Sequence, residues 1–171
     1  MRKLPILITI CFIVAASVVS ARAESQSNDP LANVRFLIGT WKCTSNMAAF
    51  RGMPAMTVPF TFTFSWGPDN ASVHEAFTAT HYEGHGFLGF DPQAKAFFEA
   101  SADNYGDVTL LKSQNASAQG VTFVGTATMR GQTIDLRSQR TKLSDTHIKT
   151  VTEAMQDGTW KQIASDDCTK S

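Results

Sequence analysis

Hydrophobic and polar positions alternate with a period of two along most of the chain from residue 35 onward. The alternation is strictest from Phe60 to Trp66, where aromatic side chains take every even position and hydroxyl side chains take every odd one. A period of two places the two classes on opposite faces of an extended segment, as in a half-buried strand. We therefore expect a strand here with one aromatic face and one polar face.

Similar runs recur along the chain, with short turn-forming segments between them. Asp157 and Gly158, for example, separate two such runs and favour a two-residue hairpin turn. Parallel strands would need crossover connections of a dozen or more residues, usually helices, and no segment after residue 38 offers a helix of that length. The pattern predicts an all-β antiparallel fold of about ten short strands, near residues 37–45, 60–66, 72–82, 86–90, 95–102, 107–113, 121–129, 132–140, 145–155 and 159–167.

The first 23 residues predict a Sec-type signal peptide. A positive start at Arg2 and Lys3 precedes an almost wholly apolar stretch, residues 4–19, and small residues surround the expected cleavage before Glu24. A membrane anchor would need about 20 apolar residues, more than this stretch holds. We expect a periplasmic or secreted protein whose single domain, residues 24–171, has no membrane anchor after cleavage.

Two cysteines remain beyond the leader, Cys43 near the start of the domain and Cys168 near its end. In an oxidising compartment such a pair favours a disulfide, the alternative being two free buried thiols. A disulfide holds its two Cα atoms within about 7 Å, which would make the first and last strands neighbours. An antiparallel meander whose ends meet closes into a barrel without exposed sheet edges.

Two segments depart from the alternation. Residues 29–36 predict one short helix, because Asp29 can cap it and Pro30 suits its first turn. Residues 46–59 show no regular pattern and contain several Met and Pro residues, which predicts a long loop between the first two strands. Long loops in compact domains often serve as lids or binding loops, so we expect this one to cover the mouth of the barrel.

Composition and charge narrow the classes of function. The chain is 43% hydrophobic and 18% charged, as in globular rather than disordered proteins. Its 15 basic residues equal its 15 acidic ones, and the leader contains three of the basic residues, so the domain carries a net charge of −3. A nucleic-acid groove needs a positive surplus, and we therefore expect no nucleic-acid partner.

Two short motifs carry a resemblance to known barrels. Leu37-Ile38-Gly39-Thr40-Trp41, after a short helix, is similar to the first-strand signature of calycins, which include lipocalins and fatty-acid-binding proteins. Residues 86–91, followed by residues 103–106, resemble the bacterial family catalogued as domain of unknown function 1579. This resemblance implies an antiparallel calycin-type, lipocalin-like barrel with a cavity, and no established reaction.

The preferred hypothesis is non-catalytic binding of a small apolar or amphipathic molecule inside the barrel. Sites for such molecules are largely apolar with a few placed polar groups, and an inward aromatic face would provide that lining. The same face could instead simply fill the interior, giving a packed barrel that acts as a protein interaction module. The expected lining residues are Phe60, Phe62, Phe64, Trp66 and Phe77.

A further alternative is a metal-binding protein or metal-dependent enzyme. His81, Glu83 and His85 would project from one face of an extended segment, and His-x-His pairs on strands can chelate Zn²⁺. Gly84 and Gly86 interrupt this run, so a bend with exposed turn residues is the preferred interpretation.

Motifs of the common enzyme classes are missing from the sequence, so no catalytic residue is assigned.

An inward Arg on a late strand could pair with a ligand carboxylate. The candidates are Arg137 and Arg140, and a position on the outer face explains Arg137 more simply. Glu75 shares a face with Phe77 and is a candidate inward polar group. Nitrobindin-like haem barrels bind iron through a late His, which residues 159–163 lack, and we expect no cofactor.

Overall fold

The computed structural model describes residues 29–113 and 115–171. The expected signal peptide, residues 1–23, lies outside these described residues. Within them the elements follow in the order η1 (Pro30–Leu37), β1 (Gly39–Met47), β2 (Met56–Trp66), η2 (Pro68–Asn70), β3 (Ser72–Ala79), β4 (Tyr82–Asp91), β5 (Ala96–Asp103), β6 (Val108–Ser113), β7 (Ala116–Ser117), β8 (Gly120–Met129), β9 (Gln132–Ser144), β10 (His147–Gln156) and β11 (Thr159–Lys170).

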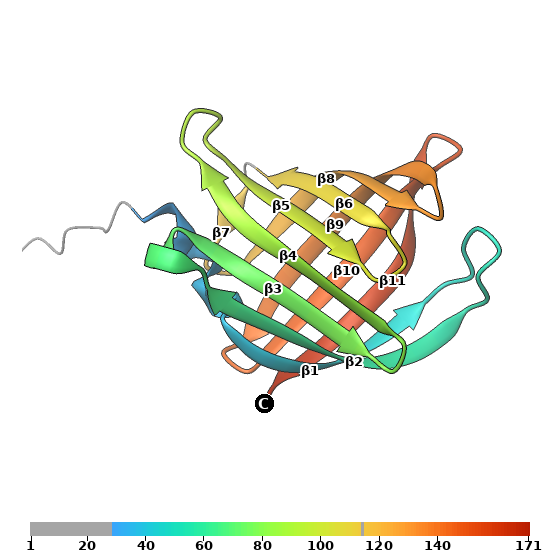
Figure 1. Ribbon diagram of the computed structural model, residues 1–171, viewed down its shortest axis with the longest axis horizontal. Helices are drawn as coiled ribbons and strands as arrows, with labels where there is room; N and C mark the ends of the chain where they lie inside the picture. The colour runs from blue at the N-terminus through green and yellow to red at the C-terminus, as the bar shows by residue number, and fades with distance from the viewer. Residues whose placement is uncertain (1–28, 114) are drawn as a thin grey trace, which may run out of the picture.

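Ten of these strands close into one antiparallel barrel (Figure 1). Strands adjacent in sequence pair with one another around the ring, except that β6 pairs with β8. The two-residue β7 only extends the ladder at the start of β8. The predicted all-β closed barrel with a short N-terminal helix is therefore confirmed.

The ring closes where the first strand meets the last. Cys43 of β1 and Cys168 of β11 are direct partners in the ladder, with Cα atoms 4.0 Å apart, and their sulfurs form a disulfide. The predicted bond and the neighbouring chain ends are confirmed. Main-chain pairing and a covalent link thus hold the same pair of strands together.

Two predicted boundaries between the third and fourth strands are wrong. The strand expected over residues 72–82 ends at Ala79, because the chain turns at Thr80 and His81, and Tyr82 already begins β4. The bend expected at Gly84 and Gly86 does not exist, since both residues lie within β4 and pair with strands on each side.

The glycines of β4 have a packing role in place of the expected bend. Gly84 is the ladder partner of Phe77 on β3. A Cβ atom on Gly84 would collide with the Phe77 ring, so the missing side chain leaves the space in which that ring lies. Aromatic rings commonly cover glycines in this way on neighbouring strands.

Helix η1 closes one end of the barrel, called here the helix end. Asp29 accepts a hydrogen bond from the Leu31 N–H and caps the helix, as predicted, and Pro30 begins its first turn. Leu37, at the end of the helix, is buried and accepts a 2.6 Å hydrogen bond from the Trp41 indole N–H. Trp41 is fully buried, so the helix and this side chain together seal the helix end.

The β1–β2 loop reaches over the opposite end, called here the lid end. It is shorter than predicted, covering residues 48–55, because the β1–β2 ladder continues until Met47 pairs with Met56. Phe50 in the loop is buried, and Arg51 donates a hydrogen bond to Gln132 at the start of β9, on a distant part of the ring. A cavity of about 90 Å³ remains between the loop and the β8–β9 turn.

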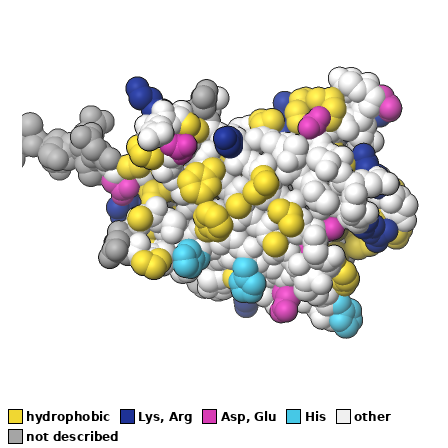
Figure 2. All heavy atoms as spheres, turned by 45° about the horizontal axis from the view of Figure 1, so that its top comes forward, with side chains coloured by type: hydrophobic (Ala, Val, Ile, Leu, Met, Phe, Trp, Pro, Cys, Tyr) yellow, Lys and Arg dark blue, Asp and Glu magenta, His cyan; other side chains and the backbone are white. Residues whose placement is uncertain are grey.

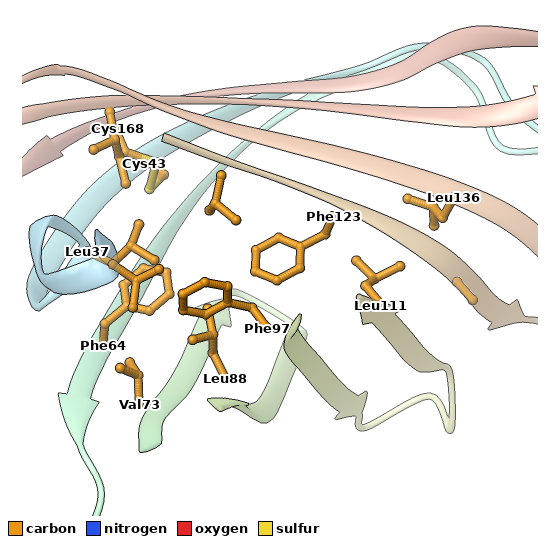
Figure 3. Packing of buried hydrophobic residues seen from close by; sticks show 14 of the residues in the cluster. Leu37, Cys43, Phe64, Val73, Leu88, Phe97, Leu111, Phe123, Leu136 and Cys168 are labelled. Carbon is orange, nitrogen blue, oxygen red and sulfur yellow. A yellow bond between two sulfur atoms is a disulfide. The ribbon is translucent and has the colours of Figure 1, made fainter. Parts of the chain in front are cut away.

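The hydrophobic core lies inside the ring, nearer to the helix end. Side chains from most of the strands converge there, as Figure 3 shows for Phe64, Leu88, Phe97 and Phe123 together with the disulfide. None of the helices within the described ranges is both long and apolar enough to span a bilayer.

Candidate functional site

The barrel interior has a tightly packed part and a more accessible part. At the helix end, the inward side chains of Phe64, Val73 and Phe123 have at most 1% of their surface exposed. Phe60 and Phe62, which point inward nearer the lid end, are only half-buried. Inward residues retain exposure only when solvent reaches them from a mouth, so the accessible part faces the lid end.

A row of aromatic rings leads from the packed part towards the lid end. Phe62 contacts Phe64 with ring centroids 4.1 Å apart and meets the Phe77 ring edge-on at 6.0 Å. Phe77 in turn lies 5.2 Å from the ring of Tyr82, and Phe60 lies 6.2 Å from Phe62. The even positions of β2 and the odd positions of β3 face inward, which is why the strand alternation gathers these rings.

The five residues expected to line a site do not all lie in one place. Phe60, Phe62 and Phe77 occupy the accessible part, whereas Phe64 belongs to the packed part. Trp66 lies near the helix end, where the Arg35 guanidinium is 5.2 Å from the centre of its ring.

A buried ion cluster lies at the boundary between the two parts. The Arg140 Nη1 atom is 3.1 Å from Glu75 Oε1 and 2.8 Å from Glu99 Oε2. All three residues are at most 5% exposed. The guanidinium also lies 5.5 Å from the Phe62 ring centre, so the cluster and the aromatic row are in contact.

The cluster combines strands from opposite sides of the ring. Glu75 comes from β3, Glu99 from β5 and Arg140 from β9. Besides Phe62, the guanidinium lies within 5.4–5.6 Å of the ring centres of Phe64 and Phe123. The arginine side chain therefore spans the interior, with aromatic faces around it and carboxylates at its tip.

Burial sets the protonation of this cluster. Loss of solvation, followed by repulsion from Glu99, raises the pKa of Glu75 from 4.5 to about 8, against the opposing attraction of Arg140. Burial works against the charged guanidinium, but Glu99 and Glu75 outweigh it and the pKa of Arg140 lies above its ordinary value. Near neutral pH, Glu75 is therefore mainly protonated and Arg140 remains a cation.

A second line of polar groups crosses the interior beside Arg140. Thr150 on β10 is the ladder partner of both Arg140 and Asp166, and Asp166 pairs with Ser45 on β1. Burial raises the pKa of Asp166, whereas a hydrogen bond with Ser45 and the charge of Arg140 lower it by less. The interior thus holds three acidic side chains, Glu75, Glu99 and Asp166, beside the Arg140 cation, and burial raises the pKa of two of these acids.

The sequence analysis predicted only part of this cluster. Glu75 does point inward, as its shared face with Phe77 indicates. Glu99 was not predicted, although it shares its face with the core residue Phe97, and a Glu is uncommon at such a position. Arg140 has the same parity as Ile134 and Leu136, which are buried, and this parity is the signal for its inward position.

The proposed metal ligands lie outside the barrel. His81 is in the β3–β4 turn, and Glu83 and His85 are exposed on the outer face of β4. Among the residues that the structure describes, no group of three or more His, Cys, Asp or Glu side chains is placed to hold a metal ion.

The outer face of β4, β5, β6 and β8 carries exposed hydrophobic side chains. Phe87, Leu110 and Val124 are 44%, 57% and 46% exposed, and Phe87 contacts the ring of Phe98 at 5.7 Å. Figure 2 shows hydrophobic side chains gathered on the side of the molecule that bears these strands. We call these four residues the outer patch.

Comparison with one solved structure supports the barrel fold. The crystal structure of Rv2717c from M. tuberculosis superposes with a TM-score of 0.60 at 7% sequence identity, over 84% of this chain and 98% of that one. This likeness shows a shared calycin-like fold. A redesigned β-barrel aligns with a TM-score of 0.39 at 14% identity, over 80% of this chain and 92% of that one.

Comparisons by sequence identify no related protein or family. No family model matches the chain, and no curated protein does. The resemblance to domain of unknown function 1579 therefore stays a prediction.

Proposed function

We propose that this protein binds a small amphipathic molecule, without catalysis, in the accessible part of its barrel. The observation that carries the proposal is the half-buried state of Phe60, Phe62 and Phe77, which point inward yet remain open to solvent. Covering such rings with an apolar ligand removes their surface from water, at about 25 cal/mol per Å². The ion cluster behind them supplies the few polar groups that orient a ligand.

The β1–β2 loop is suited to act as a lid over this site. It lies across the lid end and is held on the far side through Arg51 and Gln132, both of which are exposed to solvent. An exposed contact of this kind is weak, so the loop can open and close without disturbing the core. We expect ligand entry and release at this end, since η1 and Trp41 seal the other.

The disulfide supports a location outside the cytoplasm. Bonds such as Cys43–Cys168 form and persist in oxidising compartments. Together with the expected leader, this bond supports our proposal of a periplasmic or secreted binding protein.

A fluorescence titration with N-phenyl-1-naphthylamine, an uncharged apolar probe, tests the binding function. We expect saturable binding to the wild type and at least tenfold weaker binding to Phe62→Ala, whose ring faces the interior. Phe87→Ala is the matched control, because it removes the same side chain from the outer face. Binding lost in Phe87→Ala and kept in Phe62→Ala would place the probe on the outer patch and overturn the proposal.

Native mass spectrometry of protein taken directly from cells gives an independent test. A binding protein often retains its ligand, and we expect an additional mass of a few hundred daltons that disappears on denaturation. Repetition with Phe62→Ala shows whether the retained molecule depends on the interior.

Protein interaction through the outer patch is a second candidate function. The exposure of Phe87, Leu110 and Val124 on neighbouring strands favours it, because monomeric proteins rarely expose large contiguous apolar areas. Sedimentation of the wild type and of Leu110→Lys tests this candidate for self-association. A wild type that remains monomeric at high concentration would remove the self-association form of it.

A further inference from the structure

A second cavity lies on the outer side of the barrel, where the β4–β5 turn meets β5 and β6. Its volume is about 300 Å³, compared with about 90 Å³ for the cavity under the β1–β2 loop. Sites for small molecules begin at about this volume and are lined mainly by apolar and aromatic side chains with a few polar groups. We call this space the outer cavity.

The walls of the outer cavity are mainly apolar. Phe97 lines it and is only 5% exposed, because its ring belongs to the hydrophobic core. Phe98 and Pro92 line it as well, and Ala96 contributes only a methyl group, which leaves the space open. The cavity therefore reaches from the surface down to the core and offers two aromatic rings to a ligand.

The ring of Phe98 is held in place by its neighbours. It lies over Gly89 on β4, where a Cβ atom would collide with it, and it meets the Phe87 ring edge-on at 5.7 Å. Rings that cover a glycine on the next strand have a fixed position in this way. This wall of the outer cavity is thus formed before any ligand arrives, and Phe98 joins the cavity to the outer patch.

Two charged residues line the outer cavity, Asp91 and Lys112. Asp91 Oδ1 accepts hydrogen bonds from the main-chain N–H groups of Gln93 and Ala94, at 2.8 and 3.1 Å, so this carboxylate is engaged by the turn. Lys112 takes part in none of the ion pairs found among the described residues. The ammonium group of Lys112 is therefore the charge that remains available to a ligand.

The surroundings of Lys112 are apolar. Its ladder partners are Phe98 on β5 and Val124 on β8, both members of the outer patch. Among the described residues on the outer faces of β5, β6 and β8, Lys112 is the only charged one. A single cation among apolar groups favours a ligand that combines one negative charge with an apolar body.

A small aromatic carboxylate has both properties. Its ring can pack edge-on or offset against Phe97 and Phe98, as aromatic pairs prefer, and its carboxylate can accept a hydrogen bond from Lys112. A second negative charge would lie near Asp91 without a second cation, and an ammonium group would be repelled by Lys112. We propose that the outer cavity is a second binding site, separate from the barrel interior, for a small aromatic monocarboxylate.

Three ligands with the same ring system test the proposal, namely 2-naphthoate, 2-naphthamide and 2-naphthylmethylamine. Each is titrated at pH 7 into isotope-labelled protein, and the shifts of the main-chain amide signals are followed by NMR. We expect 2-naphthoate to bind about fivefold more tightly than the amide, a ratio typical of a partly exposed ion pair, and the amine to bind most weakly. The largest shifts should occur in residues 91–98 and at Lys112.

Two results of this titration would overturn the proposal. Equal or tighter binding of 2-naphthamide would show that Lys112 does not recognise the carboxylate. Shifts that are absent from residues 91–98, or confined to other parts of the chain, would show that the outer cavity is not the site.

Two variants assign the binding to the residues of the outer cavity. Lys112→Gln should reduce the affinity for 2-naphthoate about fivefold and leave that for 2-naphthamide unchanged. Lys149→Gln, on the exposed outer face of β10, is the matched control and should bind as the wild type does. Ala96→Leu places a larger side chain in the cavity and should weaken the binding of both ligands. Loss of both ligands in Lys112→Gln, or full binding by Ala96→Leu, would contradict the assignment.

Competition separates this site from the barrel interior. We expect 2-naphthoate to leave N-phenyl-1-naphthylamine bound in the interior and to bind Phe62→Ala as it binds the wild type. Displacement of the probe together with weaker binding to Phe62→Ala would place 2-naphthoate inside the barrel and overturn the outer site, while the proposed binding function would stand. If the probe does not bind at all, the interior function fails, and the amide shifts still decide the outer site because they do not depend on the probe.

Discussion

At the scale of single residues, the two arginines of β9 have opposite environments. Arg140 is inside the barrel and contacts two buried carboxylates, whereas Arg137 is on the outer face, where its Nε atom lies 2.5 Å from Glu153. The two side chains differ by an odd number of positions, so the alternation of the strand sends them to opposite faces. Arg140 therefore contributes to the buried interior of the barrel, whereas Arg137 makes only a contact at the surface.

Replacing Arg140 by methionine should strongly destabilise the protein. Glu75 and Glu99 would remain buried without a cation, and the loss of one partner from such a cluster costs about 3–5 kcal/mol. Urea unfolding followed by tryptophan fluorescence measures the change. Arg137→Met is the control and should unfold close to the wild-type midpoint, and equal midpoints for the two variants would contradict the buried cluster.

The raised pKa of Glu75 predicts a pH-dependent stability. In the folded protein this pKa is about 8, compared with 4.5 for an ordinary Glu. Between these two values the folded state binds more protons than the unfolded state, so stability falls as the pH rises from 4.5 to about 8. The contribution of Glu75 is intact below pH 4.5 and fully lost above pH 8.

Unfolding in urea at a series of pH values checks this prediction. The wild type should lose on the order of a few kcal/mol of unfolding free energy across the window, and Glu75→Gln should lose much less because it has no carboxyl group to ionise. Glu83→Gln should follow the wild type. A Glu75→Gln profile parallel to that of the wild type would show that another group causes the loss.

At the scale of elements, the strands and turns follow closely from local pattern. The turn at Asp157 and Gly158 has positive φ at both residues, as its sequence demands. That Gly84 lies within a strand and not in a bend could not be predicted in the same way. Its role depends on the Phe77 ring of another strand. Local periodicity reports which face a residue occupies, but contacts across the ring depend on register.

The same limit explains the predictions for the site. Inward aromatic residues on β2 could be predicted, because alternation alone determines their face. The order of the strands along the sequence does not show that Glu75 and Arg140, which are 65 residues apart, lie in contact inside the barrel. The cysteine pair was the exception. Because two cysteines in an oxidising compartment favour a disulfide, their presence predicted a long-range contact that the alternation of residues does not show.

Removal of the disulfide tests how far β1 and β11 depend on it. The double variant Cys43→Ser, Cys168→Ser should lose about 2–5 kcal/mol of unfolding free energy, because the bond closes a loop of 125 residues in the unfolded chain. The folded structure should persist, since main-chain pairing between these strands remains. Thermal unfolding with and without reductant measures the loss, and a reduced wild type should match the double variant.

At the scale of the whole molecule, the two ends of the barrel are closed in different ways. The helix end is closed by η1 and by buried side chains such as Trp41 and Phe64. The lid end is covered only by the β1–β2 loop, beneath which Phe60 and Phe62 stay accessible. Every long strand passes through both regions, so stability should change along each strand rather than from one strand to the next.

Hydrogen exchange can measure this gradient directly. Amides of residues 62–66 in β2, next to the packed part, should exchange more slowly than those of residues 56–60, which lie towards the lid. Opening near the loop requires few buried contacts to break, and low contact density goes with fast local opening. Addition of N-phenyl-1-naphthylamine should slow exchange mainly in residues 56–60 and in the loop over residues 48–55. Protection confined to residues 62–66 would instead place the ligand in the packed part, where the fully buried side chains leave it no room.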